Sequence, residues 1–196
     1  MRAFAAAVAA LALVAGCSVE RAETPTFQST PTPVSTPPVK PSGPSPAPVK
    51  YATERLKSCL DIRQQVGAEL PVAEPDDDQS AGSHSSSRTC TFRAPEQTTV
   101  FSVRSWENTD DATGVMSGGD HAKKYFTDRS ASWEKDGDVN IGSDARWREG
   151  RAPDCALEVL DENAVLVVVR TGDTDGEQCR ASARELAKKF YAAVQP

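Results

Sequence analysis

The chain begins with a short apolar leader that ends at a cysteine, and this leader decides which residues remain to fold. An arginine follows the first methionine, residues 3–15 are apolar, and Ala15 and Gly16 are small enough for a peptidase to reach the bond before Cys17. These thirteen apolar residues are fewer than the roughly 20 that a helix needs to span the hydrocarbon core of a bilayer. We therefore expect residues 1–16 to be a cleaved export signal.

The residues around the cleavage site resemble a bacterial lipobox. The run is Leu13-Val14-Ala15-Gly16-Cys17. The resemblance implies a diacylglyceryl thioether on the sulfur of Cys17, and two or more acyl chains, at about 0.8 kcal/mol per buried methylene, anchor a protein stably. We expect a lipid anchor that holds the mature chain on the extracytoplasmic face of the cell membrane. An ordinary secretory signal with an incidental cysteine is the alternative.

Residues 17–50 combine this cysteine with a segment rich in proline, serine and threonine. Nine of the 14 prolines lie between Pro25 and Pro48. Dense proline favours extended polyproline II, and the low apolar content cannot offset the entropy of ordering. We expect a disordered tether that holds the folded part away from the membrane. Its Ser and Thr residues permit O-glycosylation, and an unmodified spacer is the alternative.

Residues 51–196 have the size of a single domain. They contain 18 Lys and Arg against 26 Asp and Glu, a net charge of −8. The sequence shows no basic run and no stripe in which arginines alternate with aromatic residues. We therefore expect no nucleic-acid partner.

Four cysteines remain once Cys17 is acylated, an even number in a chain that has left the reducing cytoplasm. Three pairings are open. We favour Cys59 with Cys90 and Cys155 with Cys179, because each pair joins neighbouring predicted elements and closes a modest loop.

One segment has the alternating oxygen-bearing residues of a calcium loop. Asp136, Asp138 and Asn140 alternate, but Ile141 and Trp147 stand where such a loop needs glycine and glutamate. The sequence therefore favours a solvated turn over a calcium site.

No motif for catalysis or for another metal is apparent. GxSxG and SxxK are absent, no CxxC occurs, and His84 and His121 lack the spacing of a metal-binding helix. We expect no catalytic residue, no metal ligand and no cofactor. With 26 acidic residues in the domain, no glycosidase-like pair can be singled out.

Helical spacing appears in three segments. The apolar positions Cys179, Ala183, Leu186, Ala187, Phe190 and Val194 predict a C-terminal helix, whose start is marked by Thr174 and Glu177 as a capping box. An N-terminal helix is expected over roughly 52–66, and another near 120–130, preceded by an N-cap around Ser117.

Five runs rich in β-formers predict strands. They are Thr89–Ala94, Thr98–Trp106, Ala145–Glu149, Cys155–Leu160 and Ala164–Arg170. The last run is apolar on both faces, so we expect a central strand covered by helices on one side. The order of elements predicts an α+β fold, with a mainly antiparallel sheet packed against N- and C-terminal helices and two disulfides. The three tryptophans are expected to be core anchors.

The polar stretch from Asp76 to Ser87 is expected to be a long loop without secondary structure. Its three consecutive aspartates, Asp76 to Asp78, either attract a cation or a basic partner or are simply solvated.

Together, these features resemble the actinobacterial lipoproteins called domain of unknown function 3558. The resemblance rests on the lipobox, the tether, Cys59-Leu60, Cys90-Thr91-Phe92 and the helix from Cys179. It covers most of residues 56–194 and implies an envelope lipoprotein of α+β fold, with no activity or site residues to carry over. The chain departs from the family at Asp61, where a second leucine is usual. Extracellular sensor domains of actinobacterial kinases are a related resemblance.

The expected function is that of a lipid-anchored binding module of the cell envelope. Its partners would be the membrane, through the lipid on Cys17, and either a small apolar or envelope-derived ligand or another envelope protein. A hydrolytic or transfer enzyme that acts on cell-wall material is the alternative.

Overall fold

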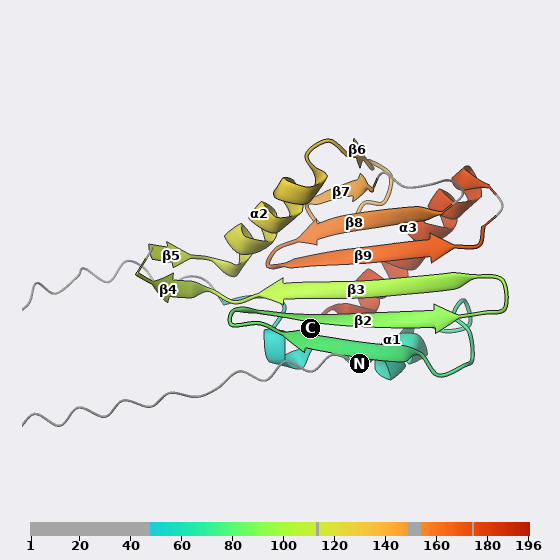
Figure 1. Ribbon diagram of the computed structural model, residues 1–196, viewed down its shortest axis with the longest axis horizontal. Helices are drawn as coiled ribbons and strands as arrows, with labels where there is room; N and C mark the ends of the chain where they lie inside the picture. The colour runs from blue at the N-terminus through green and yellow to red at the C-terminus, as the bar shows by residue number, and fades with distance from the viewer. Residues whose placement is uncertain (1–47, 113, 149–153, 174) are drawn as a thin grey trace, which may run out of the picture. The chain divides into compact units, whose positions relative to one another are not determined.

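A seven-stranded antiparallel sheet organises the part of the chain that the computed structural model describes, residues 48–112, 114–148, 154–173 and 175–196. The predicted leader, Cys17, the tether up to residue 47, Glu149 and Thr174 lie outside these residues. Each neighbouring pair of strands is antiparallel, in the order β1-β2-β3-β9-β8-β7-β6 (Figure 1). This arrangement confirms the expected α+β class and the mainly antiparallel sheet.

The strands are short at one edge of the sheet and long in its middle. They are β1 (Asp76–Ala81), β2 (Ser85–Arg93), β3 (Thr98–Trp106), β6 (Glu134–Lys135), β7 (Asp144–Trp147), β8 (Cys155–Asp161) and β9 (Ala164–Thr171). A separate hairpin of β4 (Thr109–Asp111) and β5 (Gly114–Met116) lies between β3 and the next helix. All five predicted strands are present, with ends shifted by a few residues.

Helices pack on both faces of the sheet. They are η1, a 3-10 helix (Thr53–Arg55), α1 (Cys59–Val66), α2 (Gly118–Ser130) and α3 (Gly176–Val194). Because side chains alternate along a strand, Leu166 of β9 joins the core under α1 and α3, whereas Val165 packs with Phe126 of α2. The expectation of helices on one side was therefore wrong. The run is apolar on both faces because each face receives a helix. Within the described ranges, every helix lacks the length or the apolar character that crossing a bilayer demands.

The predicted apolar stripe of α3 is its buried face. Phe190 is fully buried and stacks on Phe101 of β3, with ring centroids 4.4 Å apart. The helix begins one residue after the position expected from a Thr174 cap, because the side chain of Asp175 accepts a hydrogen bond from the backbone N–H of Gln178 at 2.9 Å.

The N-terminal helix is shorter than predicted. Only Thr53–Arg55 and Cys59–Val66 are helical in this segment, and Leu56 and Ser58 between them are extended. Ser58 starts the second helix, since its hydroxyl accepts from the N–H of Asp61 at 3.2 Å and thereby caps a new first turn. Its apolar face still buries Cys59 and Ile62, as expected.

The expected loop from Asp76 to Ser87 is instead a hairpin of β1 and β2, so that prediction was wrong. All six residues of β1 are exposed, which removes the alternation by which a strand is recognised in a sequence. Pairing holds the strand in place, because Asp77 receives two hydrogen bonds from Arg88 of β2, at 2.9 and 2.7 Å, and one from the N–H of Cys59 at 3.2 Å.

The chain enters the domain through Lys50 and Tyr51, which bind the turn between β8 and β9. The hydroxyl of Tyr51 donates to Asp161 at 2.5 Å, and the ammonium of Lys50 donates to the same oxygen at 2.6 Å. Asn163 bonds both the N–H and the carbonyl of Tyr51. Burial and the bond to Asp161 raise the pKa of Tyr51. The predicted tether thus joins the domain at a fixed point.

Both favoured disulfides are present. Cys59–Cys90 joins α1 to β2, and Cys155–Cys179 joins the start of β8 to the first turn of α3. The linked residues are 31 and 24 positions apart.

Replacing the second disulfide, by Cys155→Ser together with Cys179→Ser, is expected to lower the free energy of unfolding by about 3 kcal/mol, because the unfolded chain regains the entropy of an open loop. Chemical denaturation of the oxidised wild type and the double variant measures this difference. Non-reducing peptide mapping is the check on pairing, and a peptide that links Cys59 to Cys155 or Cys179 would contradict it.

Candidate functional site

A cleft of about 740 Å³ opens where β6, β7 and the start of β8 meet the first turn of α3. Its walls include Glu134 of β6, Trp147 of β7, Asp154 and, from α3, Glu177 and Arg180. The volume lies within the range of roughly 300–1,000 Å³ that is typical of small-molecule sites. We call this feature the α3 cleft.

The second disulfide positions the floor of the α3 cleft. Cys155 lines the cleft, and its bond to Cys179 ties the beginning of β8 to the beginning of α3. Both cysteines are buried. Asp154 and Arg180, their sequence neighbours, are thereby brought to the same cavity.

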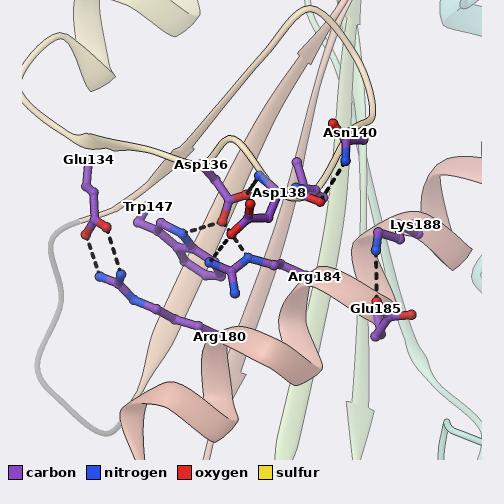
Figure 2. A network of polar contacts seen from close by, with 10 residues as sticks. Glu134, Asp136, Asp138, Asn140, Trp147, Arg180, Arg184, Glu185 and Lys188 are labelled. Carbon is purple, nitrogen blue, oxygen red and sulfur yellow. Dashed lines mark hydrogen bonds and ion pairs between the residues drawn. The ribbon is translucent and has the colours of Figure 1, made fainter.

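A buried carboxylate, Asp136, fixes the wall between the β6–β7 loop and α3 (Figure 2). One of its oxygens accepts hydrogen bonds from the backbone N–H groups of Asp138 and Val139, both at 2.9 Å. The other accepts from the indole of Trp147 and from Nε of Arg184, both at 2.7 Å. With its side chain fully buried, Asp136 therefore connects the loop, a strand and a helix.

These contacts explain the calcium-like pattern of Asp136, Asp138 and Asn140. The oxygens of Asp136 are occupied by protein donors, and the side chain of Asn140 donates to the carbonyl of Asp138 at 3.1 Å. Within the described part of the chain, no group of three or more His, Cys, Asp or Glu residues could hold a metal ion. The pattern forms a turn held by its own hydrogen bonds.

The environment of Asp136 keeps it ionised. Burial alone would raise the pKa of this carboxyl group, but the hydrogen bonds from Arg184, from two backbone N–H groups and from Trp147 outweigh it and lower the pKa below its ordinary value.

Arg180 forms the second fixed contact of this wall. Its guanidinium donates to both oxygens of Glu134, at 3.0 and 2.8 Å, and its central carbon lies 5.1 Å from the centre of the Trp147 ring. The bond from Arg180 lowers the pKa of Glu134. Arg184 contacts the same ring at 5.4 Å, so two guanidiniums of α3 flank the indole.

Among the described residues, the lining of the α3 cleft carries more negative than positive charge. These ionisable residues are Glu134, Asp154, Asp175, Glu177, Arg148 and Arg180. Both guanidiniums are already paired, Arg180 with Glu134 and Arg148 with the buried Glu158. Asp154, Asp175 and Glu177 form no ion pair with any described residue. These three exposed carboxylates are the groups that the cleft offers to a ligand.

A second cleft, of about 490 Å³, lies on another flank of α3. Leu186 and Ala181 contribute apolar surface, and Arg170 lies beside them. An ion pair between Lys189 and Glu69 joins two of its lining residues, and the bond from Lys189 lowers the pKa of Glu69. This cleft is smaller than the α3 cleft, and two of its charged residues are already paired with each other. It is therefore the second candidate for a ligand site.

The structure does not assemble the two histidines into a site. His84 is exposed in the turn between β1 and β2, whereas His121 of α2 bonds the hydroxyl of Thr109 at 2.9 Å. Trp106 and Trp147 are buried, as expected of core anchors, and Trp133 is half-buried.

Sequence reasoning missed the acidic lining of the α3 cleft. A usable signal was present, since pairing Cys155 with Cys179 places their sequence neighbours side by side. Asp154, Glu177 and Arg180 all lie within two residues of one of these cysteines.

The chain matches no protein-family model, no curated protein and no solved structure. The resemblance to domain of unknown function 3558 accordingly stays a prediction, and the chemistry of the cleft is argued from its own residues.

Asp136→Asn is expected to lower the free energy of unfolding by about 3 kcal/mol at neutral pH, because the change weakens a buried ionic contact with Arg184. The matched variant Asp138→Asn alters a carboxylate that is 83% exposed and 3.9 Å from Arg184, and should cost less than about 0.5 kcal/mol.

The effect of Asp136→Asn should depend on pH. The pKa of Asp136 is lower in the folded state than in the unfolded state. The stabilisation of the folded state by this carboxylate is therefore fully present above the unfolded-state pKa of about 4, and it is lost as the pH falls through the folded-state pKa. Urea unfolding across this acidic range should show the two proteins converging in stability. A constant difference at every pH would mean that the charge of Asp136 is not what stabilises the wall.

Proposed function

We propose that the chain is a lipid-anchored module on the extracytoplasmic face of the cell membrane, where it binds an envelope-derived ligand without catalysing a reaction. The leader that ends at Cys17 and the proline-rich segment after it support the anchor and the tether. The two disulfides support a compartment outside the reducing cytoplasm.

The α3 cleft carries the binding part of this proposal. It is a 740 Å³ concavity whose wall is fixed by the bonds of Asp136 and Arg180, and three carboxylates of its described lining form no ion pair with a described residue. Fixed walls reduce the entropy that binding costs. The polar lining favours a polar ligand with a free amine over a small apolar ligand. Peptide fragments of the cell wall have this chemistry. The smaller cleft beside Leu186 is the better candidate for an apolar ligand.

An enzyme that acts on cell-wall material is the second candidate, and it would need a carboxyl group with a raised pKa to serve as a general acid. The carboxyl groups at the wall of the cleft with a resolved shift, Glu134 and Asp136, have lowered pKa values and are bonded to arginines. Tyr51 has a raised pKa, but its hydroxyl is bonded to Asp161. These observations support binding over catalysis.

Cys17→Ala is expected to move the protein from the membrane fraction to the soluble extracytoplasmic fraction, because the only proposed acylation site is lost. Fractionation with immunodetection measures the distribution, and Ser18→Ala is the matched control that should remain on the membrane. Equal membrane association of Cys17→Ala and the wild type would refute the lipid anchor.

Asp154→Asn and Glu177→Gln are each expected to weaken binding of a soluble muropeptide with a free side-chain amine by about fivefold, because each removes a charge that faces the ammonium group. Isothermal titration calorimetry measures the affinity. Asp128→Asn, an exposed change of the same charge on α2, should leave the affinity unchanged.

The same muropeptide with its amine acetylated distinguishes the contribution of the ammonium charge to binding from the contribution of the ligand's shape. The affinity of the wild type for the acetylated form should be no higher than the affinity of either variant for the form with a free amine. Equal affinity of the free and the acetylated forms would refute the amine-binding role of the cleft.

A further inference from the structure

The fold assembles an arginine and aromatic stripe that the sequence does not show. We define the stripe as Arg104 of β3, Tyr125 and Arg129 of α2, Trp133, and Arg148 at the end of β7. The guanidiniums of Arg104 and Arg129 lie 5.4 and 4.7 Å from the centre of the Tyr125 ring, and that of Arg148 lies 5.6 Å from the Trp133 ring. The stripe is not visible along the sequence, because its members come from separate elements.

A buried glutamate holds the stripe together from beneath. Glu158 of β8 is fully buried, and one of its oxygens accepts hydrogen bonds from both Arg129, at 3.2 Å, and Arg148. Its other oxygen is buried without a partner among the described residues. One carboxylate therefore orients two guanidiniums and neutralises half of their charge.

Most of the hydrogen-bond donors of the stripe form no bond with a described residue, and two of these donors, Nε of Arg104 and Nε of Arg148, are buried. A guanidinium has five N–H donors. The side chain of Arg104 forms no hydrogen bond or ion pair with any described residue. The side chain of Arg129 bonds only Tyr125 and Glu158, and that of Arg148 bonds only Glu158. The side chains of Arg129 and Arg148 are 39% and 36% exposed. Three arginines against one carboxylate leave the stripe positive in a domain whose net charge is −8.

Hydroxyl groups continue this surface across the sheet. Helix α2 packs against β3, β8 and β9, and the side chains beside it on the same face of β2 and β3 are half-exposed. Thr89 and Ser102 are direct cross-strand partners there, and Ser87 pairs with Arg104. The surface thus combines cations, aromatic rings and hydroxyls.

We propose that this stripe binds an acidic polysaccharide. Planar guanidiniums match carboxylates, and serine and threonine hydroxyls bond to sugar hydroxyls. The rings of Tyr125 and Trp133 hold the guanidiniums in place. An acidic peptide would use the arginines but not the hydroxyl-bearing face, so the polysaccharide accounts for more of the surface. The stripe is separate from the proposed amine-binding role of the α3 cleft, except that Arg148 lines both.

The test measures binding of polygalacturonate oligomers to the folded protein by isothermal titration calorimetry at low and high ionic strength. Arg104→Gln and Arg129→Gln, neither of which lines the α3 cleft, should each weaken binding by about tenfold. Lys123→Gln, an exposed change of the same charge on α2, should have no effect. High ionic strength should weaken binding to the wild type.

Two further ligands decide the chemical class. Fully methyl-esterified oligomers lack the charge and should not bind, and poly-glutamate of equal charge should bind much more weakly than polygalacturonate. Equal binding of poly-glutamate, or full affinity of both arginine variants with unchanged thermal unfolding, would overturn the proposal. Because Arg148 still bonds the buried Glu158 in Arg129→Gln, this variant should fold even if Arg104→Gln does not. Asp154→Asn should leave the affinity for polygalacturonate unchanged. A failure of the polysaccharide proposal can therefore be told apart from a failure of the amine-binding role of the α3 cleft.

Discussion

The attachment of α3 to the sheet is the constraint on which the rest of the domain depends. Phe190 stacks on Phe101 in the middle of the core, and the Cys155–Cys179 bond fixes the first turn of the helix to β8. The two contacts lie about three turns apart along the helix, so together they fix both its position and its rotation. Arg180 and Arg184 then point toward the β6–β7 loop, and the wall of the α3 cleft follows from that orientation.

The sequence was most informative where burial is complete. The strands β8 and β9, the helix α3 and both disulfides were predictable, because buried apolar residues recur at the period of the element and cysteines pair in an oxidising compartment. It was least informative at the edge. Strand β1 is exposed along its whole length, so its aspartates resemble a solvated loop until the pairing of Asp77 with Arg88 is known. The apolar character of both faces of β9 signals that both are covered, but it does not tell that α2 is the helix on the second face.

The two candidate surfaces differ in how far the sequence could have revealed them. The acidic residues of the α3 cleft lie next to two cysteines, so a disulfide prediction already brings them together. The arginines of the stripe lie on β3, on α2 and directly after β7, and only the sheet order β3-β9-β8-β7 under α2 makes them neighbours. The spacing of residues along a chain predicts contacts within one helix or strand well, and it predicts contacts between different helices and strands poorly.

Glu158 separates the charges of the two surfaces. Side chains alternate along β7, so Trp147 faces α3 while Arg148 faces α2, and the acidic cleft and the basic stripe meet at this pair of residues. An unpaired Arg148 would be drawn to the cleft carboxylates and would cancel part of their charge. Glu158 is buried and bonds Arg148 on the α2 side, so the guanidinium of Arg148 is paired there although the residue also lines the cleft. Asp154 and Glu177 remain without a cationic partner among the described residues. One buried carboxylate thus allows surfaces of opposite charge to meet at two successive residues, Trp147 and Arg148, that point to opposite faces of the sheet.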